Sequence, residues 1–165
     1  MSRSFDFQKG VFRLWEDEGL DTFFKATWTE SQKESFLAIS DGEASPSQPY
    51  PYCVVEFSNP VVGSRSSGSS CANDETREYS EIAFVFNVYA KHTQATPAKI
   101  AAGELASRVL EVFGGSPTVS PKSISIPNGT VLLCQYVTDN PEKVGDQEYR
   151  WTVSYLASID SPVKL

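Results

Sequence analysis

The sequence has a single histidine, His92, and only three cysteines, Cys53, Cys71 and Cys134, with no CxxC pair. A Ser-His-Asp or Cys-His catalytic site would have to use His92, and no recognisable nucleophile motif accompanies it. Four Cys or His ligands at zinc-site spacing are lacking as well. We therefore expect His92 to be an ordinary surface residue, the thiols to stay reduced, and the protein to be a non-enzyme that needs no metal or other cofactor.

Basic residues are also scarce, with 14 Lys and Arg against 21 Asp and Glu and a formal net charge of -7. General nucleic-acid binding needs a surplus of positive charge, so it is not expected. Apolar stretches long enough to span a membrane are missing, and residues Met1 to Gly10 have no apolar core of the kind a signal peptide needs. We expect no membrane partner and assembly in a cytoplasm.

Phosphate-binding GxxxxGK[ST] loops are absent from the sequence. The one cluster with chemical potential is acidic and precedes a predicted strand; it consists of Asp74, Glu75, Glu78 and Glu81. Carboxylates at this spacing could hold a cation or act in acid/base catalysis. A solvated strand entrance is the commoner fate of such a run. An enzyme that uses this cluster is kept as an alternative.

The length and the hydrophobic content of 40% fit one globular domain over residues 1–165. A helix is predicted at the start, because Phe7, Val11, Leu14 and Trp15 follow the spacing of one buried face. Ser4 is its expected N-cap, and Gly19 its expected end. Leu20 to Trp28 is ambiguous, and a second short helix is favoured there.

A second long helix is predicted over about Pro97 to Phe113, with Thr96 as cap and Gly114-Gly115 as terminator. Its apolar stripe consists of Ala101, Leu105, Val109, Val112 and Phe113. Four strands are predicted from alternation of apolar residues: Tyr52–Phe57, Tyr79–Ala90, Val131–Val137 and Glu148–Ile159. A polar turn with Asn140-Pro141 and Gly145-Asp146 joins the last two.

The expected fold is therefore α+β: an antiparallel sheet of four or slightly more strands, with the N-terminal helix and the second helix packed on one face. Tyr79–Ala90 is apolar on both faces. This pattern predicts a central strand that is covered by helix on one side and by more protein, such as a neighbouring subunit, on the other.

Residues Ser58 to Thr76 are rich in serine and glycine, which predicts a flexible loop at about 58–78. A mobile hairpin tip and a functional arm are both open for it. Tyr50 and Tyr52 lie among prolines, where amphipathic aromatic residues often contact partners. With Arg65 and Arg77, they are the residues expected to contact a partner protein.

Several segments are similar in pattern and order to one known family. They lie between Val11 and Ile159 and comprise Leu20-Asp21, Asp41-Gly42-Glu43-Ala44, Pro49 to Glu56, Glu81 to Ala90, Ala98 to Ala101 and Trp151 to Tyr155. In these segments the chain resembles the tail terminator, or tail completion, proteins at the neck of long-tailed bacteriophages and related prophages. The longer Ser/Gly-rich loop and the extended segment from Trp28 to Ser47 depart from the family pattern, which leaves another neck, tube or minor tail component open.

The resemblance implies an N-terminal helix, an antiparallel sheet and a helix packed across it. It also implies a virion protein without catalytic activity, which forms a hexameric ring at the head-proximal end of the tail, ends tube growth and joins tail to head. Its expected partners are further copies of itself, the tail tube protein and the head–tail connector proteins. A small-ligand-binding α+β module is the alternative from a different class.

Overall fold

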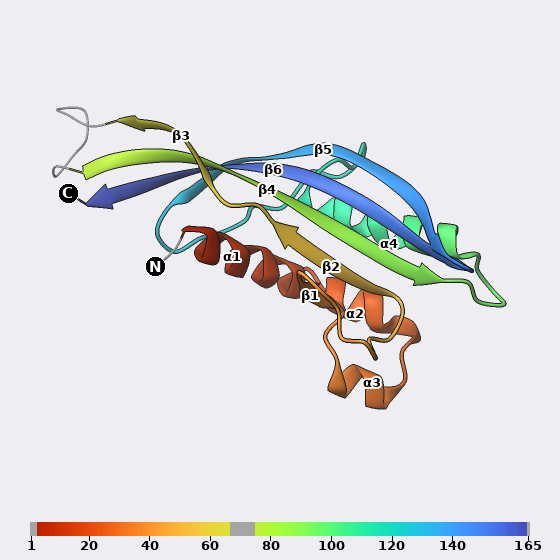
Figure 1. Ribbon diagram of the computed structural model, residues 1–165. Helices are drawn as coiled ribbons and strands as arrows, with labels where there is room; N and C mark the ends of the chain where they lie inside the picture. Colours follow the sequence, from red (N-terminus) through yellow and green to blue (C-terminus); the bar gives the residue numbers. More distant parts are fainter. Residues whose placement is uncertain (1–2, 67–74, 165) are drawn as a thin grey trace.

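The computed structural model describes residues 3–66 and 75–164, and it shows an α+β fold built on one large sheet (Figure 1). The broad fold class is therefore as predicted, including the N-terminal helix. In chain order the elements are α1 (Arg3–Asp17), α2 (Leu20–Phe24), η1 (Lys25–Thr27), α3 (Glu30–Ser35), β1 (Ile39–Asp41), β2 (Tyr52–Phe57), β3 (Val61–Ser66), β4 (Glu75–Lys91), α4 (Ala98–Phe113), β5 (Thr130–Gly145) and β6 (Glu148–Lys164).

The six strands lie in the order β1-β2-β4-β6-β5, and β3 pairs with β4 beyond the end of β2. The predicted pairs β2–β4 and β5–β6 are confirmed, and both are antiparallel. The prediction of a purely antiparallel sheet is wrong, because β1 runs parallel to β2. β1 has three residues, too few for an alternating pattern to reveal it in the sequence.

The hydrophobic core lies between the sheet and the two long helices, α1 and α4. The Phe84 ring of β4 packs edge-on against Phe7 of α1, with centroids 5.3 Å apart, and against Phe113 of α4 at 6.4 Å. Because one side chain meets both helices, α1 and α4 cover the same face of the sheet. Each fully buried side chain of this size contributes about 1.5–3 kcal/mol to folding.

The helical start of the chain follows its sequence pattern. Phe7, Val11, Leu14 and Trp15 are all buried, and α2 with η1 confirms the short helix. Gly19 has a φ of 71°, a conformation that suits glycine and lets α1 turn directly into α2. Ser4 is not the N-cap, since α1 extends back to Arg3 and the Ser4 hydroxyl accepts a hydrogen bond from Gln8 Nε2 instead.

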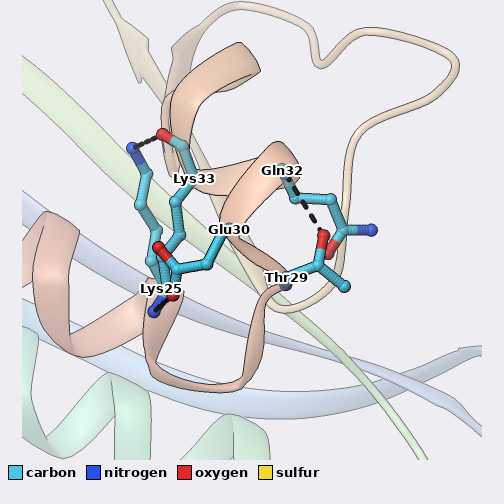
Figure 2. Close-up of polar contacts among 5 residues, drawn as sticks. All are labelled: Lys25, Thr29, Glu30, Gln32 and Lys33. Carbon is cyan, nitrogen blue, oxygen red and sulfur yellow. Dashed lines mark hydrogen bonds and ion pairs between the residues drawn. The ribbon is translucent and has the colours of Figure 1, made fainter.

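The short helix α3 is held by polar contacts (Figure 2). Thr29 and Gln32 form a capping box, in which each side chain accepts a hydrogen bond from the other's backbone N–H. Lys25 Nζ, from η1, donates to the carbonyl of Lys33 at 3.2 Å, and Lys33 pairs with Glu30. These contacts stabilise six residues that bury no side chain of their own.

α4 begins one residue later than predicted, because Pro97 takes the N-cap position and Thr96 lies outside the helix. Its buried residues are Ala98, Ala102, Leu105, Ala106, Val109, Val112 and Phe113, so Ala102 is on the buried face and Ala101 is only half-buried. Gly114 and Gly115 end the helix with φ values of 128° and 100°, as predicted for that pair.

Three strands, β4, β5 and β6, are longer than the sequence pattern indicated. Asn140-Pro141 lies inside β5 and not in a turn; the reversal to β6 falls at Asp146 and Gln147. Proline is tolerated there because β5 lies at the sheet edge, where a missing N–H costs no ladder bond. The predicted loop at 58–78 is also corrected, since 61–66 form β3 and β4 begins at Glu75; residues 67–74 lie outside the described part.

Candidate assembly surfaces

The face of the sheet opposite α1 and α4 is the first candidate surface. On β4 this face presents Ala83, which is exposed, and Val85 and Tyr89, which are half-buried. The other face of the same strand, with Ile82, Phe84, Phe86 and Val88, is completely buried. The predicted helix cover is confirmed on that face, and the predicted cover of the opposite face by a neighbouring subunit stays a prediction.

The β5 edge is the second candidate surface, and three irregularities shape it. The register with β6 shifts between Val131 and Leu133, between Tyr136 and Thr138, and between Lys143 and Gly145. Each shift leaves one additional residue on β5, which is the signature of a β-bulge. The additional residues are Leu132, Val137 and Val144, and all three are exposed, at 55%, 57% and 39%. At each bulge, an apolar side chain is therefore exposed to solvent along this edge.

Leu133, next to the first bulge, is 54% exposed as well. A strand at a sheet edge carries a row of N–H and C=O groups that can pair with another chain. Natural edge strands usually carry charge or proline to discourage such pairing. The first half of β5, Thr130 to Tyr136, carries neither. This half of β5 is therefore open to pairing with another chain.

The opposite edge of the sheet is made by β1 and β3, which lie at different levels. Val61, at the start of β3, is 66% exposed. β3 contains its own register shift between Val62 and Ser64. The sheet therefore has two different open edges in the described part of the chain, and both carry exposed apolar residues.

A groove of about 420 Å³ runs between α4 and β5. Asp139 of β5 and Trp151 of β6 form part of its wall, and the Trp151 Nε1–H donates to Asp139 Oδ2 at 2.7 Å. The Tyr136 hydroxyl donates to the other oxygen of Asp139, and this hydrogen bond raises the pKa of Tyr136. Asp139 thus fixes two aromatic side chains beside the edge.

Tyr50 and Tyr52, predicted as partner contacts, lie together at one end of the sheet. Their rings are 5.0 Å apart, and Tyr52 stacks on Tyr89 at 4.9 Å. The Tyr50 hydroxyl donates to Glu148 Oε1 at 2.7 Å, and Lys91 Nζ lies 4.2 Å from the centre of the Tyr50 ring. Burial, followed by the hydrogen bond to Glu148, raises the pKa of Tyr50, so its hydroxyl stays protonated. The cluster is aromatic and half-buried.

Arg65 and Arg77, the other predicted contacts, lie at the opposite end of the sheet. Arg65 belongs to β3 and Arg77 to β4, where Arg77 is the register partner of Ser66. Tyr52, by contrast, pairs with Tyr89 near the other end of β4. The structure therefore separates the four residues into two groups, and their role in partner contact stays a prediction.

A smaller cavity of about 290 Å³ opens beside the tyrosine cluster. Its walls come from α2, η1, the segment before β2, the end of β4 with the loop after it, and α4; they include Phe23, Tyr50, Lys91 and Glu104. Sequence reasoning did not find this cavity, because its lining residues are scattered over 83 positions of the chain, from 23 to 105. Such a site could accept a small apolar group with a polar end.

Of the remaining residues singled out by the sequence, those that the structure describes form no common site. His92 is exposed, as predicted. Glu81 is half-buried, but Glu78 is only 4% exposed, so the prediction of a solvated acidic entrance is wrong for Glu78. Its position on β4 faces the same side as Ser80 and Ile82, towards the interior. Asp74 lies outside the described residues. Within residues 3–66 and 75–164, no group of three or more His, Cys, Asp or Glu is placed to hold a metal ion.

No family model matches the chain, and no curated protein matches it. Among solved structures, one similar chain comes from the virion of a native gene transfer agent particle. It is 18% identical, the match covers 75% of this chain and 79% of that chain, and the TM-score is 0.42. Across the described ranges, no helix combines the length and the apolar character needed to cross a membrane.

Proposed function

We propose that the chain is a structural virion protein of a phage or phage-like particle and acts as a tail terminator. It forms an oligomeric ring, with six copies as the expected number, at the head-proximal end of the tail. The ring ends growth of the tail tube and joins the tail to the head. The protein assembles in the host cytoplasm, carries no catalytic activity and needs no cofactor. Another neck or minor tail component is the closest alternative.

The observation that carries the proposal is the pair of open sheet edges with exposed apolar residues. A closed ring needs two different surfaces on each subunit, because each copy must offer one surface to the neighbour on either side. The β5 edge with Leu132, Leu133 and Val137, and the β3 edge with Val61, supply two such surfaces. The sequence resemblance to tail terminators supports the same role independently.

The faces that remain free in such a ring would contact the tube and the connector. Tyr50 and Tyr52 at one end of the sheet and Arg65 and Arg77 at the other are the proposed contact residues. Because the protein carries a net charge of -7, basic patches on the partners would favour association. The connection between α4 and β5 enters the sheet at Thr130, at the end that carries Arg65 and Arg77, and is proposed to contact a partner there.

Tail tubes assembled from the tube protein of the same virion provide the test. Gold-labelled protein is expected at one end of each tube in electron micrographs, and tubes with bound protein are expected to stop elongating. The Arg65→Glu/Arg77→Glu variant is expected to cap fewer tubes, while Arg13→Glu, an exposed change on α1, is expected to cap as the wild type does. Labelling along the whole tube, or none at all, would contradict the terminator role.

The cavity beside Tyr50 favours a second candidate, a small-ligand-binding module. Its volume of about 290 Å³ is close to the lower limit of small-molecule sites. A ligand that binds there would raise the unfolding temperature, since binding to the folded state alone stabilises it. A thermal-shift screen of metabolites checks this. Stabilisation that disappears in the Phe23→Ala variant would support the ligand-binding role over the terminator role.

A further inference from the structure

Val61 and Leu133 lie at the two ends of one continuous row of paired residues across the sheet. Val61 of β3 is paired with Glu81 of β4, Glu81 with Ser158 of β6, and Ser158 with Leu133 of β5. Residues directly opposite one another on neighbouring strands point to the same face. The two edges of the sheet therefore expose an apolar side chain at the same level and on the same face, 66% and 54% exposed.

The adjacent rows show the same correspondence. Val62 is paired with Ser80, Ser80 with Ile159, and Ile159 with Val131, so each edge has valine at this position. Ser64 leads through Tyr79 and Asp160 to Thr130, so each edge has a hydroxyl residue there. Both edges also bulge at this level, at Gly63 on β3 and at Leu132 on β5.

The strand directions are compatible as well. β3 is antiparallel to β4, β4 to β6, and β6 to β5. β3 is therefore antiparallel to β5 within one subunit. A rotation about an axis that runs along the strands keeps their directions. The β3 edge of a second copy related in this way would lie antiparallel to β5, which is the more stable arrangement for pairing.

Charge limits the contact to one half of β5. At the level of β1, Asp41 leads through Val55, Phe86 and Val153 to Asp139. Pairing of β1 with β5 would set two carboxylates opposite each other, and like charges in that position are destabilising. It is also a different arrangement from pairing of β3 with β5, because β2 lies between β1 and β4, whereas β3 pairs with β4 directly. No such pair arises at the level of β3, where the register partners on the two edges are Val61, Val62 and Ser64 against Leu133, Val131 and Thr130.

We infer that copies of this chain join head to tail by adding β3 of one copy to β5 of the next, antiparallel, with Val61 directly opposite Leu133. The occupant of the β5 edge is thus a second copy of the chain. This inference deepens the proposed function and rests on it, because it names the surface by which the ring closes. It predicts one sheet that continues from subunit to subunit.

Site-specific disulfide formation tests the contact. Two proteins are made, both with Cys71→Ser and Cys134→Ser; one carries Val61→Cys and the other Leu133→Cys. Opposite residues of an antiparallel pair lie about 4.5–5.5 Å apart at Cα, within the range that a disulfide spans. The two proteins are mixed, oxidised at high concentration and digested. Mass spectrometry is expected to find the 61–133 peptide pair as the main cross-link.

In the matched control, the second protein carries Ala83→Cys in place of Leu133→Cys. Ala83 is exposed on the same face of the sheet but belongs to a central strand. Cross-linking of this control to Val61→Cys is expected to be at least tenfold weaker. Cross-links between two Leu133→Cys chains in place of 61–133 would overturn the inference in favour of a symmetric β5–β5 dimer. Absence of the 61–133 pair overturns it as well.

Light scattering separates this failure from failure of the proposed function. If the wild type forms oligomers larger than dimers but yields no 61–133 cross-link, the edge contact is wrong and the ring survives. If it caps no tubes and stays monomeric at all concentrations, the ring itself fails. Leu133→Lys is expected to abolish oligomers, whereas Leu37→Lys, an equally drastic change at a residue 68% exposed outside both edges, is expected to leave them intact.

Discussion

Tyr155 donates a hydrogen bond from its hydroxyl to the backbone carbonyl of Gly114, over 2.7 Å. The tyrosine is buried in the middle of β6, and the carbonyl belongs to the residue that ends α4. Burial raises the pKa of Tyr155, so the hydroxyl stays protonated and remains a donor. This bond connects the sheet to the end of its main covering helix.

We expect Tyr155→Phe to lower the free energy of unfolding by about 1–3 kcal/mol, because it leaves a buried carbonyl without its donor. Urea denaturation followed by circular dichroism measures the change. Tyr149→Phe is the control, since Tyr149 lies on the same strand, is half-buried and should change stability by less than about 0.5 kcal/mol. Equal stability of the two variants would show that the bond to Gly114 contributes nothing.

Gly10 lies in the middle of α1, where alanine would ordinarily be better by about 1 kcal/mol. The structure reverses this expectation. A Cβ at Gly10 would lie 2.7 Å from the carbonyl oxygen of Ser125 and 3.0 Å from Ile124. The absence of a side chain lets the segment before β5 pack directly onto α1.

We therefore expect Gly10→Ala to destabilise the protein by about 1–3 kcal/mol, the usual cost of overpacking. Arg13→Ala, at an exposed position of the same helix, serves as the comparison and should be close to neutral. Thermal unfolding of the two variants checks this. A higher unfolding temperature for Gly10→Ala than for the wild type would mean that residues 124–126 move away from α1 at little cost.

The sequence was sufficient to predict the elements whose apolar residues keep a strict period. α1, α4, β2 and the middle of β4 were found for this reason. The prediction is wrong where the period is interrupted: the predicted strand stops at Val137, which is the additional residue of a bulge inside β5. The sequence predicts a loop at β3 because Gly63, Ser64 and Ser66 belong to a run rich in serine and glycine, and pairing with the long strand β4 overrides that preference.

The candidate surfaces show the same division. Tyr50 and Tyr52 are predicted as partner contacts from their local context, and that role stays a prediction. The β5 edge is not predicted, since edges follow from strand order and not from one segment. A signal was nevertheless present in Val131-Leu132-Leu133. Three consecutive apolar residues cannot all face one side of a strand. One of them had to be covered by something else, and Leu132 and Leu133 are both exposed.

Cys134 gives a pH-dependent probe of how firmly β5 is held. Burial raises the pKa of Cys134 to about 12. Only the thiolate reacts with iodoacetamide, so at pH 8 a fraction of about 10⁻⁴ of Cys134 is reactive. This thiolate fraction grows as the pH increases towards the raised pKa of Cys134. Cys53 is fully buried, and burial raises its pKa well above the ordinary value as well.

In a Cys71→Ser background, we expect Cys134 to be alkylated at pH 8 roughly a thousandfold more slowly than a free cysteine, with a rate that rises about tenfold per pH unit from pH 9 to 11. Peptide mass spectrometry follows the modification. A cysteine introduced by Ser107→Cys, at an exposed position of α4, is the reference and should react at the rate of free cysteine. If Cys134 reacts as fast as this reference, β5 must detach from α4 readily, and the edge proposed to receive β3 would not be preformed.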